Sequence, residues 1–196
     1  MADSRDVILG RIRTALGNRP AAREIPRDYE RSRVLPSVPD LFAERVADYR
    51  AVVHRLDDPV PFLARLAGKR IAVPDDVPTE WLVPDETWLR EPLSVTDLDG
   101  CDGVLTGCAV GIAETGTIVL DAGVAQGRRA LTLLPDYHLC VVRESQIVGT
   151  VPAALRRLDP VRPLTFVSGP SATSDIELDR VEGVHGPRTL EVLIVP

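Results

Sequence analysis

Three polar segments punctuated by glycine interrupt the otherwise apolar second half of this 196-residue sequence. They are residues 114–117, 168–177 and 183–187, and each lies beside an apolar, strand-like run. Together they supply carboxylates, hydroxyls and one imidazole, which are groups that proton transfer and small-ligand binding require. Because loops at the ends of strands carry the ligand sites of α/β sheets, we expect the three segments to converge on one cleft.

The first segment places a carboxylate, Glu114, just before a turn that Gly116 predicts. In that position Glu114 is a candidate general base or nucleophile, while the alternative is a hairpin turn that its carboxylate holds together. Thr115 and Gly116 are candidate substrate contacts, because small residues allow the backbone to approach a ligand closely. The local sequence leaves both interpretations of Glu114 open.

The second segment follows a predicted strand and begins Ser-Gly-Pro-Ser, which resembles a strand-to-helix turn. Exposed amides at such a turn form an anion site, and the alternative is that the hydroxyls simply cap a helix. The segment lacks the lysine-bearing signature of a phosphate-binding P-loop, and its acidic residues would repel a phosphate. The candidate substrate-binding residues of this segment are Ser168, Gly169, Ser171, Thr173, Asp175 and Glu177.

The third segment contains His185, a candidate for proton transfer near neutral pH, although a structural histidine is the alternative. We interpret His54, in a predicted helix, and His138, at the start of a predicted strand, as structural. The three histidines lack close metal-ligand spacing, so no metal site is expected. The Gly-x-Gly-x-x-Gly fingerprint of dinucleotide-binding folds is also absent from the sequence.

Composition restricts the class of protein. The net charge is −6, although residues 1–36 hold eight arginines against five acidic residues. An acidic body argues against nucleic-acid binding, whereas the arginine-bearing arm is either solvated or meets an acidic partner. No apolar run is long enough to span a bilayer, and no secretory signal is visible, so we expect a cytoplasmic protein. Three cysteines without Cys-x-x-Cys spacing predict no disulfide framework and no iron–sulfur site in this chain.

The periodicity of apolar residues predicts an α/β fold. Ser4 is expected to cap a helix that Gly17 ends, and a Pro- and Arg-rich arm completes a first region, residues 1–39. Within the second region, residues 40–196, Asp40 is expected to cap a helix that continues to Leu56. Short helices are predicted at 59–66 and 151–158, and strands at 70–73, 103–106, 118–120, 139–142, 164–167 and 190–195. Their alternation favours a three-layer sandwich around a mostly parallel sheet.

In order and spacing, these motifs resemble the LUD domain, the family of lactate utilisation protein C. The matching segments are Ala113–Thr117, Leu133–Pro135 leading into His138–Val142, Ser168–Ser171 with Asp175–Glu177, and Gly183–Pro187. The resemblance implies a fold similar to that of ribose-5-phosphate isomerases, glucosamine-6-phosphate deaminases and CoA transferases. It also implies a three-component system that oxidises L-lactate to pyruvate, with iron–sulfur clusters on the partner subunits and none in this chain.

Three hypotheses about function follow from these observations. The chain is an accessory or substrate-handling subunit that binds a small carboxylate, with Glu114 or His185 as the base. Alternatively it is a stand-alone isomerase or acyl/CoA transferase in which Glu114 is the nucleophile or base. The third hypothesis is a non-catalytic scaffold whose arm docks the iron–sulfur subunits.

Overall fold

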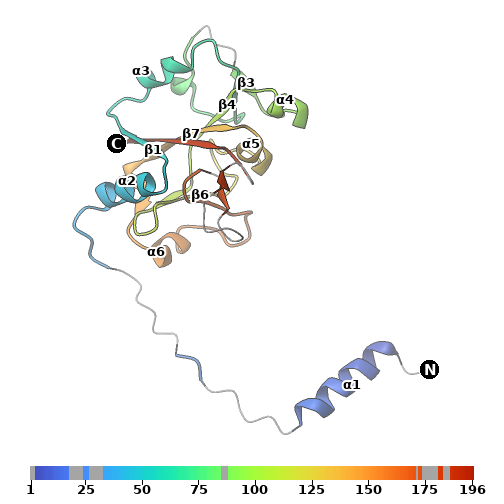
Figure 1. Ribbon diagram of the computed structural model, residues 1–196. Coiled ribbons are helices and arrows are strands. Elements are labelled where there is room, and N and C mark those ends of the chain that lie inside the picture. Colours follow the sequence, from blue (N-terminus) through green and yellow to red (C-terminus); the bar gives the residue numbers. More distant parts are fainter. Residues whose placement is uncertain are drawn as a thin grey trace. The chain divides into compact units, whose positions relative to one another are not determined.

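The chain consists of two units, Met1–Glu30 and Arg31–Pro196. Figure 1 shows its computed structural model, which describes residues 3–17, 24–26, 33–84, 88–170, 172–173, 181–182 and 186–196. The division predicted after residue 39 falls within helix α2 (Val38–Asp48) of the second unit. Residues 33–39 therefore belong structurally to the α/β unit.

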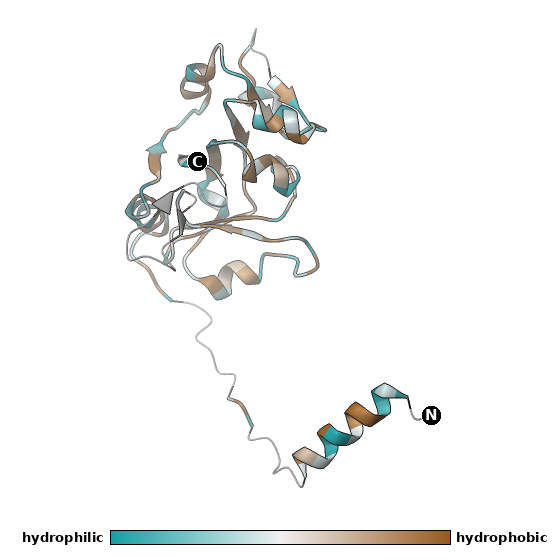
Figure 2. Cartoon of the chain, turned by 45° about the vertical axis from the view of Figure 1, so that its right-hand side comes forward, coloured by the Kyte–Doolittle hydropathy of each residue, from teal (hydrophilic) through white to brown (hydrophobic). Residues whose placement is uncertain are grey.

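The first unit contains helix α1 (Ser4–Leu16), as predicted. Its N-cap is Asp3, whose carboxylate accepts the amide of Arg5, so the prediction that Ser4 caps the helix was wrong by one residue. Gly17, at a φ of 48°, ends the helix as expected. The helix alternates apolar and polar surface (Figure 2), and its exposed apolar side chains are Val7, Ile8, Ile12 and Leu16.

A six-stranded parallel sheet forms the centre of the second unit. Its strand order is β1-β12-β7-β4-β2-β3, and every neighbouring pair is parallel. The strands predicted from continuous apolar runs are confirmed here. β7 and β12 are buried on both faces, so their sequences need no alternation of apolar and polar residues. The strands are β1 (Val52–Arg55), β2 (Ile71–Val73), β3 (Trp88–Arg90), β4 (Gly103–Thr106), β7 (Tyr137–Arg143) and β12 (Thr189–Val195).

A smaller sheet of four strands, in the order β8-β5-β6-β9, belongs to the same unit. Its strands are β5 (Val110–Ile112), β6 (Thr117–Leu120), β8 (Ile147–Val148) and β9 (Thr165–Val167). β6 pairs antiparallel with β5 and β9, whereas β5 and β8 are parallel. Ile118 and Leu120 of β6 share a buried core with Cys140 and Val192 of the large sheet. Strands β10 (Ala172–Thr173) and β11 (Val181–Glu182) form a separate antiparallel pair.

Helices cover both faces of the parallel sheet. Helix α2 contributes Phe42 and Val46 to the core that the two sheets share, while α3 (Val60–Leu63) packs Leu63 on the opposite face. The unit is thus a mixed α/β fold with a central parallel sheet flanked by helices, which confirms the predicted class. The other helices are α4 (Val95–Asp99), α5 (Arg129–Leu133) and α6 (Val151–Leu155), with 3₁₀ turns η1 (Ala64–Leu66), η2 (Thr79–Trp81) and η3 (Glu144–Gln146).

The helix predicted from Asp40 to Leu56 was wrong in its second half. Ser37, rather than Asp40, caps α2, and its hydroxyl accepts the amide of Asp40. The chain leaves the helix at Arg50, whose φ is 66°, and then enters strand β1. His54 therefore lies in a strand. Tertiary pairing with β12 decides the conformation here, because residues 52–55 supply the partners of residues 191–194.

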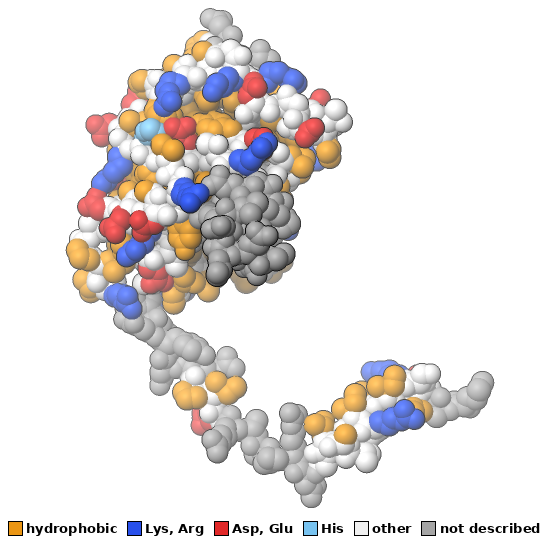
Figure 3. Space-filling model, in the orientation of Figure 1, with side chains coloured by type: hydrophobic (Ala, Val, Ile, Leu, Met, Phe, Trp, Pro, Cys, Tyr) orange, Lys and Arg blue, Asp and Glu red, His pale blue; other side chains and the backbone are white. Residues whose placement is uncertain are grey.

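On one face of the second unit, charged side chains of both signs are mixed with apolar ones (Figure 3). Among the helices that the structure describes, none combines the length and apolar character needed to cross a bilayer.

Candidate functional site

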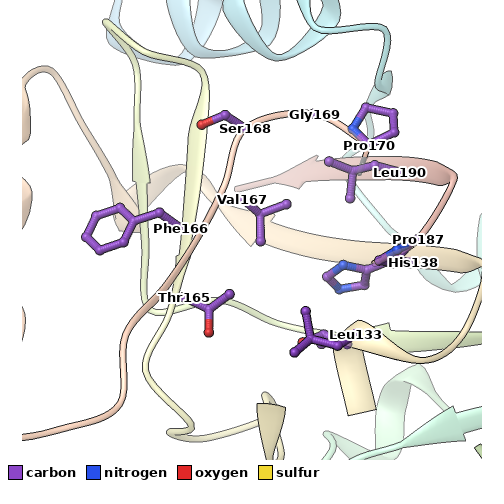
Figure 4. A pocket seen from close by; sticks show the side chains of 11 residues that line it. Leu133, His138, Thr165, Phe166, Val167, Ser168, Gly169, Pro170, Pro187 and Leu190 are labelled. Atoms are coloured by element: carbon purple, nitrogen blue, oxygen red, sulfur yellow. The ribbon is translucent and has the colours of Figure 1, made fainter. Parts of the chain in front are cut away.

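A cavity of about 340 Å³ opens where strand β9 ends, and two of the predicted site residues, Ser168 and Gly169, line it. We call it the β9 cavity (Figure 4). Gly169 adopts a φ of 80°, a left-handed conformation that glycine accepts without steric cost. The remaining lining comes from α5, β7, β9, β12, the segment after β9 and the loop before β12: Thr132, Leu133, His138, Thr165, Phe166, Val167, Pro170, Pro187 and Leu190.

The β9 cavity combines apolar walls with neutral hydrogen-bonding groups. Hydroxyls come from Thr132, Thr165 and Ser168, and an imidazole comes from His138. The described lining residues include no Asp, Glu, Lys or Arg. Such a lining suits a small molecule with an apolar part and a few oxygen atoms, which hydroxyls and amides can orient.

His138 is the buried histidine of this site, with only 1% of its surface exposed. Its Nε2 lies 2.8 Å from Oγ1 of Thr106 on the neighbouring strand β4. Cys140 lies two residues further along β7, and its thiol donates to the carbonyl of Gly107 at 3.6 Å. The imidazole thus lies between the cavity and a buried polar cluster, where it can hold or pass on a proton.

Two thiols complete this buried cluster. The hydrogen bond from Cys108, together with bonds to His138 and Thr106, outweighs burial and lowers the pKa of the Cys140 thiol. The same bond to Cys140, followed by burial, raises the pKa of the Cys108 thiol.

Glu114 lies in the turn between β5 and β6 and is not among the described residues of the β9 cavity. Its Oε1 accepts the backbone amide of Val151, the first residue of α6, at 2.7 Å. Its own amide donates to the carbonyl of Gly149 at 3.1 Å. The carboxylate thus satisfies an amide at the start of α6, 37 residues away in sequence, and not an amide of its own hairpin turn as the structural alternative supposed.

Gly116 adopts a φ of 58° and packs against the backbone of α2. A Cβ atom placed on it would lie 2.5 Å from the carbonyl group of Arg45. This glycine is therefore required by close packing between the hairpin and the helix. It leaves no room there for a ligand between the two backbones.

A line of hydroxyls connects the first predicted segment with the second. Thr115 Oγ1 lies 2.7 Å from Thr117 Oγ1, and Thr117 Oγ1 lies 2.8 Å from Ser168 Oγ. Thr115 is thereby linked to the β9 cavity through two hydrogen bonds. The structure thus links these two segments, and the convergence of all three segments on one cleft stays a prediction.

The other predicted site residues, Ser171, Asp175, Glu177 and His185, lie outside the described residues. For Thr173 the structure describes the backbone, which belongs to β10. Of the site residues proposed from the sequence, Ser168 and Gly169 line the cavity. Thr115 is linked to Ser168 through Thr117, and Glu114 is hydrogen-bonded to the first residue of α6.

Sequence reasoning missed the position of His138 at the cavity. We interpreted it as structural because it opens a nearly continuous apolar run. Its partner Thr106 lies 32 residues away, so no local pattern connects the two. In the register of β4 and β7, His138 lies opposite Val104 and Thr106 lies opposite Cys140, so the contact between His138 and Thr106 is a diagonal one.

Comparison with known proteins places this chain in a family. Residues 95–195 match the LUD domain. Lactate utilization protein C of Deinococcus radiodurans is 47% identical over 196 aligned residues, covering 93% of this chain and 91% of that protein. Lactate utilization protein C of Shouchella clausii is 34% identical over 104 residues, or 48% of this chain and 44% of that protein.

A solved structure is also similar. The crystal structure of a duf162 family protein from Deinococcus radiodurans superimposes with a TM-score of 0.70 at 43% identity, covering 81% of this chain and 96% of that chain. These similarities establish the class of the protein, a mixed α/β fold built around a parallel sheet. The chain belongs to the LUD domain family.

Proposed function

We propose that this chain is a cytoplasmic component of a lactate-utilisation system that oxidises L-lactate to pyruvate. Its role there is to bind the small carboxylate, as an accessory or substrate-handling subunit. Support for the pathway comes from the relative named lactate utilization protein C, which is similar over nearly the whole chain. Kinship to ribose-5-phosphate isomerases, glucosamine-6-phosphate deaminases and CoA transferases remains an expectation.

The observation that carries the proposed binding role is the lining of the β9 cavity. Hydroxyls of Thr165 and Ser168 match the hydroxyl or keto oxygen of a three-carbon acid, and Leu133 and Val167 offer apolar contact to its methyl group. Amides beside Gly169 are the proposed partners of its carboxylate. The volume of about 340 Å³ accommodates such an acid together with bound water.

Oxidation of L-lactate to pyruvate releases two electrons and two protons, so a base and an electron acceptor are both required. Glu114 and His185 remain the proposed bases, and His138 is added as a group that can relay a proton from the cavity wall. Iron–sulfur clusters on partner subunits are the proposed acceptor. Cys108 and Cys140 lie in one core cluster of this chain, whereas Cys101 packs against another.

Isothermal titration calorimetry with L-lactate, D-lactate and pyruvate tests the binding role. We expect binding of L-lactate or pyruvate that Ser168→Ala weakens, because the variant removes a hydroxyl from the cavity wall. Ser145→Ala, an exposed serine in η3, is the matched control and should bind as the unaltered protein does. An absence of binding heat for all three acids would refute substrate handling and favour the scaffold hypothesis.

A further inference from the structure

A second cavity, of about 330 Å³, lies at the carboxyl ends of the central parallel strands. Gly107 and Cys108, directly after β4, form one wall, and Val141 and Arg143, at the end of β7, form another. None of its lining residues belongs to the β9 cavity. Ligands of open α/β sheets bind at this edge, because the loops that leave the strands there surround a crevice.

The lining of this second cavity is rich in arginine, so we call it the arginine cavity. Arg143, Arg157 and Arg162 contribute guanidinium groups, and Asp121 is the single carboxylate among the described lining residues. Three positive charges against one negative leave a formal excess of two positive charges. Asp121 Oδ2 lies 2.6 Å from Arg162 Nη1, so this carboxylate is paired with an arginine.

The other two arginines are held in place by their surroundings. The guanidinium carbon of Arg143 lies 5.7 Å from the centre of the Trp81 ring, within the range of a cation–π contact. Arg157 Nη1 donates to the carbonyl of Ser145 at 2.9 Å. A guanidinium carries five N–H donors, so each of these contacts leaves donors in a fork that matches carboxylate or phosphate oxygens.

The loop that covers the arginine cavity is strained. Ala122 and Ala125 have φ values of 53° and 58°, although alanine rarely adopts this conformation. The strain is maintained by specific bonds. The side chain of Gln126 accepts the amide of Asp121 at 2.6 Å, and the amide of Gly107 donates to the carbonyl of Ala125 at 2.7 Å. Strained backbone held in this way is typical of ligand sites, where it fixes a shape before binding.

We propose that the arginine cavity binds a small dianionic metabolite, either a phosphate monoester or a dicarboxylate. The charge excess selects two negative charges over the single charge of lactate or pyruvate, and the arginine forks supply the donors. Trp81 and Val141 provide an apolar wall for the carbon part of the ligand. This site is additional to the monocarboxylate site proposed at the β9 cavity, and it makes the protein responsive to a second metabolite.

The test is a fluorescence titration of the full chain carrying Trp88→Phe, which leaves Trp81 as the remaining tryptophan. Succinate and glycerol 3-phosphate are the dianionic probes at pH 8, and L-lactate and acetate are the monoanionic ones. We expect a dianion to change Trp81 fluorescence at concentrations at which the monoanions do not. Which dianion binds more tightly distinguishes a carboxylate ligand from a phosphate ligand.

Variants locate the binding site. Arg143→Gln and Arg157→Gln should each weaken dianion binding by about tenfold, the scale of one charge-assisted hydrogen bond. Arg143→Lys, which retains the charge, should weaken it less. Arg129→Gln, an exposed arginine of α5 outside both cavities, is the matched control and should leave binding unchanged.

Three results would overturn the proposal: no dianion binds, the monoanions bind equally well, or both glutamine variants retain full affinity. Thermal unfolding of each variant shows whether it is folded, and calorimetry replaces fluorescence if Trp81 does not respond. Failure here is distinguishable from failure of the proposed function. L-lactate binding at the β9 cavity should persist in Arg143→Gln, and dianion binding should persist even if lactate does not bind.

Discussion

Replacing Gly116 by alanine should destabilise the second unit far more than an ordinary glycine substitution does. The left-handed φ of 58° costs alanine about 1–2 kcal/mol relative to glycine. The new Cβ would also lie 2.5 Å from the carbonyl carbon and oxygen of Arg45 and 2.8 Å from the amide nitrogen of Val46. These are backbone atoms of α2 that cannot rotate away, and overpacking of this kind adds about 1–3 kcal/mol.

Gly68→Ala provides the matched control. Gly68 also has a left-handed φ, of 75°, but a Cβ atom placed there meets nothing within 4 Å. It should therefore lose only the conformational part, about 1–2 kcal/mol. Subtracting the two effects isolates the close approach of the hairpin to α2, which we expect to be worth about 1–3 kcal/mol.

Urea unfolding followed by circular dichroism measures both free energies. The dependence of the free energy of unfolding on urea concentration should be similar in the two variants, because unfolding exposes the same surface in each. If Gly116→Ala costs no more than Gly68→Ala, the packing of Gly116 against α2 is not the reason for glycine at this position. A ligand contact at residues 115–116, as the sequence suggested, would then become the better explanation.

Three further outcomes are expected. Glu114→Gln should retain most of the stability because its amide oxygen can still accept the Val151 amide, whereas Glu114→Ala should lose about 1 kcal/mol in urea unfolding; equal losses would contradict a helix-start role. Burial, followed by the hydrogen bond to Glu191, raises the pKa of Tyr137, so stability should fall as pH rises above the unfolded tyrosine value near 10. Tyr137→Phe should remove that alkaline decrease in unfolding measured against pH, and its persistence would assign the decrease to other groups. Gly10→Ala should increase helix content by circular dichroism in a peptide spanning α1, because no atom lies within 4 Å of the added Cβ; unchanged helicity would count against α1 as an autonomous helix.

The strands of the central sheet could be predicted because burial on both faces leaves a nearly continuous apolar run. Residues 139–142 and 190–195 were identified for this reason, and the structure extends them to β7 and β12. The two-residue strand β8 and the three-residue strand β5 were missed. Strands this short derive their conformation from pairing across the sheet rather than from a local pattern.

The boundary between α2 and β1 could not be predicted for a different reason. Val46, Val53 and Leu56 continue an approximately helical spacing past the end of the helix. The helix breaks at Arg50, which has a left-handed conformation that an arginine in the sequence does not predict. Residues 52–55 form a strand because they pair with β12, although their apolar residues continue the helical spacing of α2.

In the candidate site, residues that follow from a local sequence pattern were predicted, and contacts between residues distant in sequence were not. Ser168 and Gly169 were identified because a serine and a glycine after a strand predict a ligand-binding turn, and both line the β9 cavity. The bond from Val151 to Glu114 joins residues 37 apart, and the His138 contact spans 32. Neither pairing can be read from one sequence, because only the folded topology brings the partners together.

Strand β12 has a consequence for how this protein is made. It follows every other strand of the large sheet in sequence, yet it lies between β1 and β7 in space. At roughly 5–20 residues per second of translation, about 7–27 s separate synthesis of residue 55 from synthesis of residue 189. During that interval β1 has no partner strand, and the edge of β7 that β12 later occupies is open.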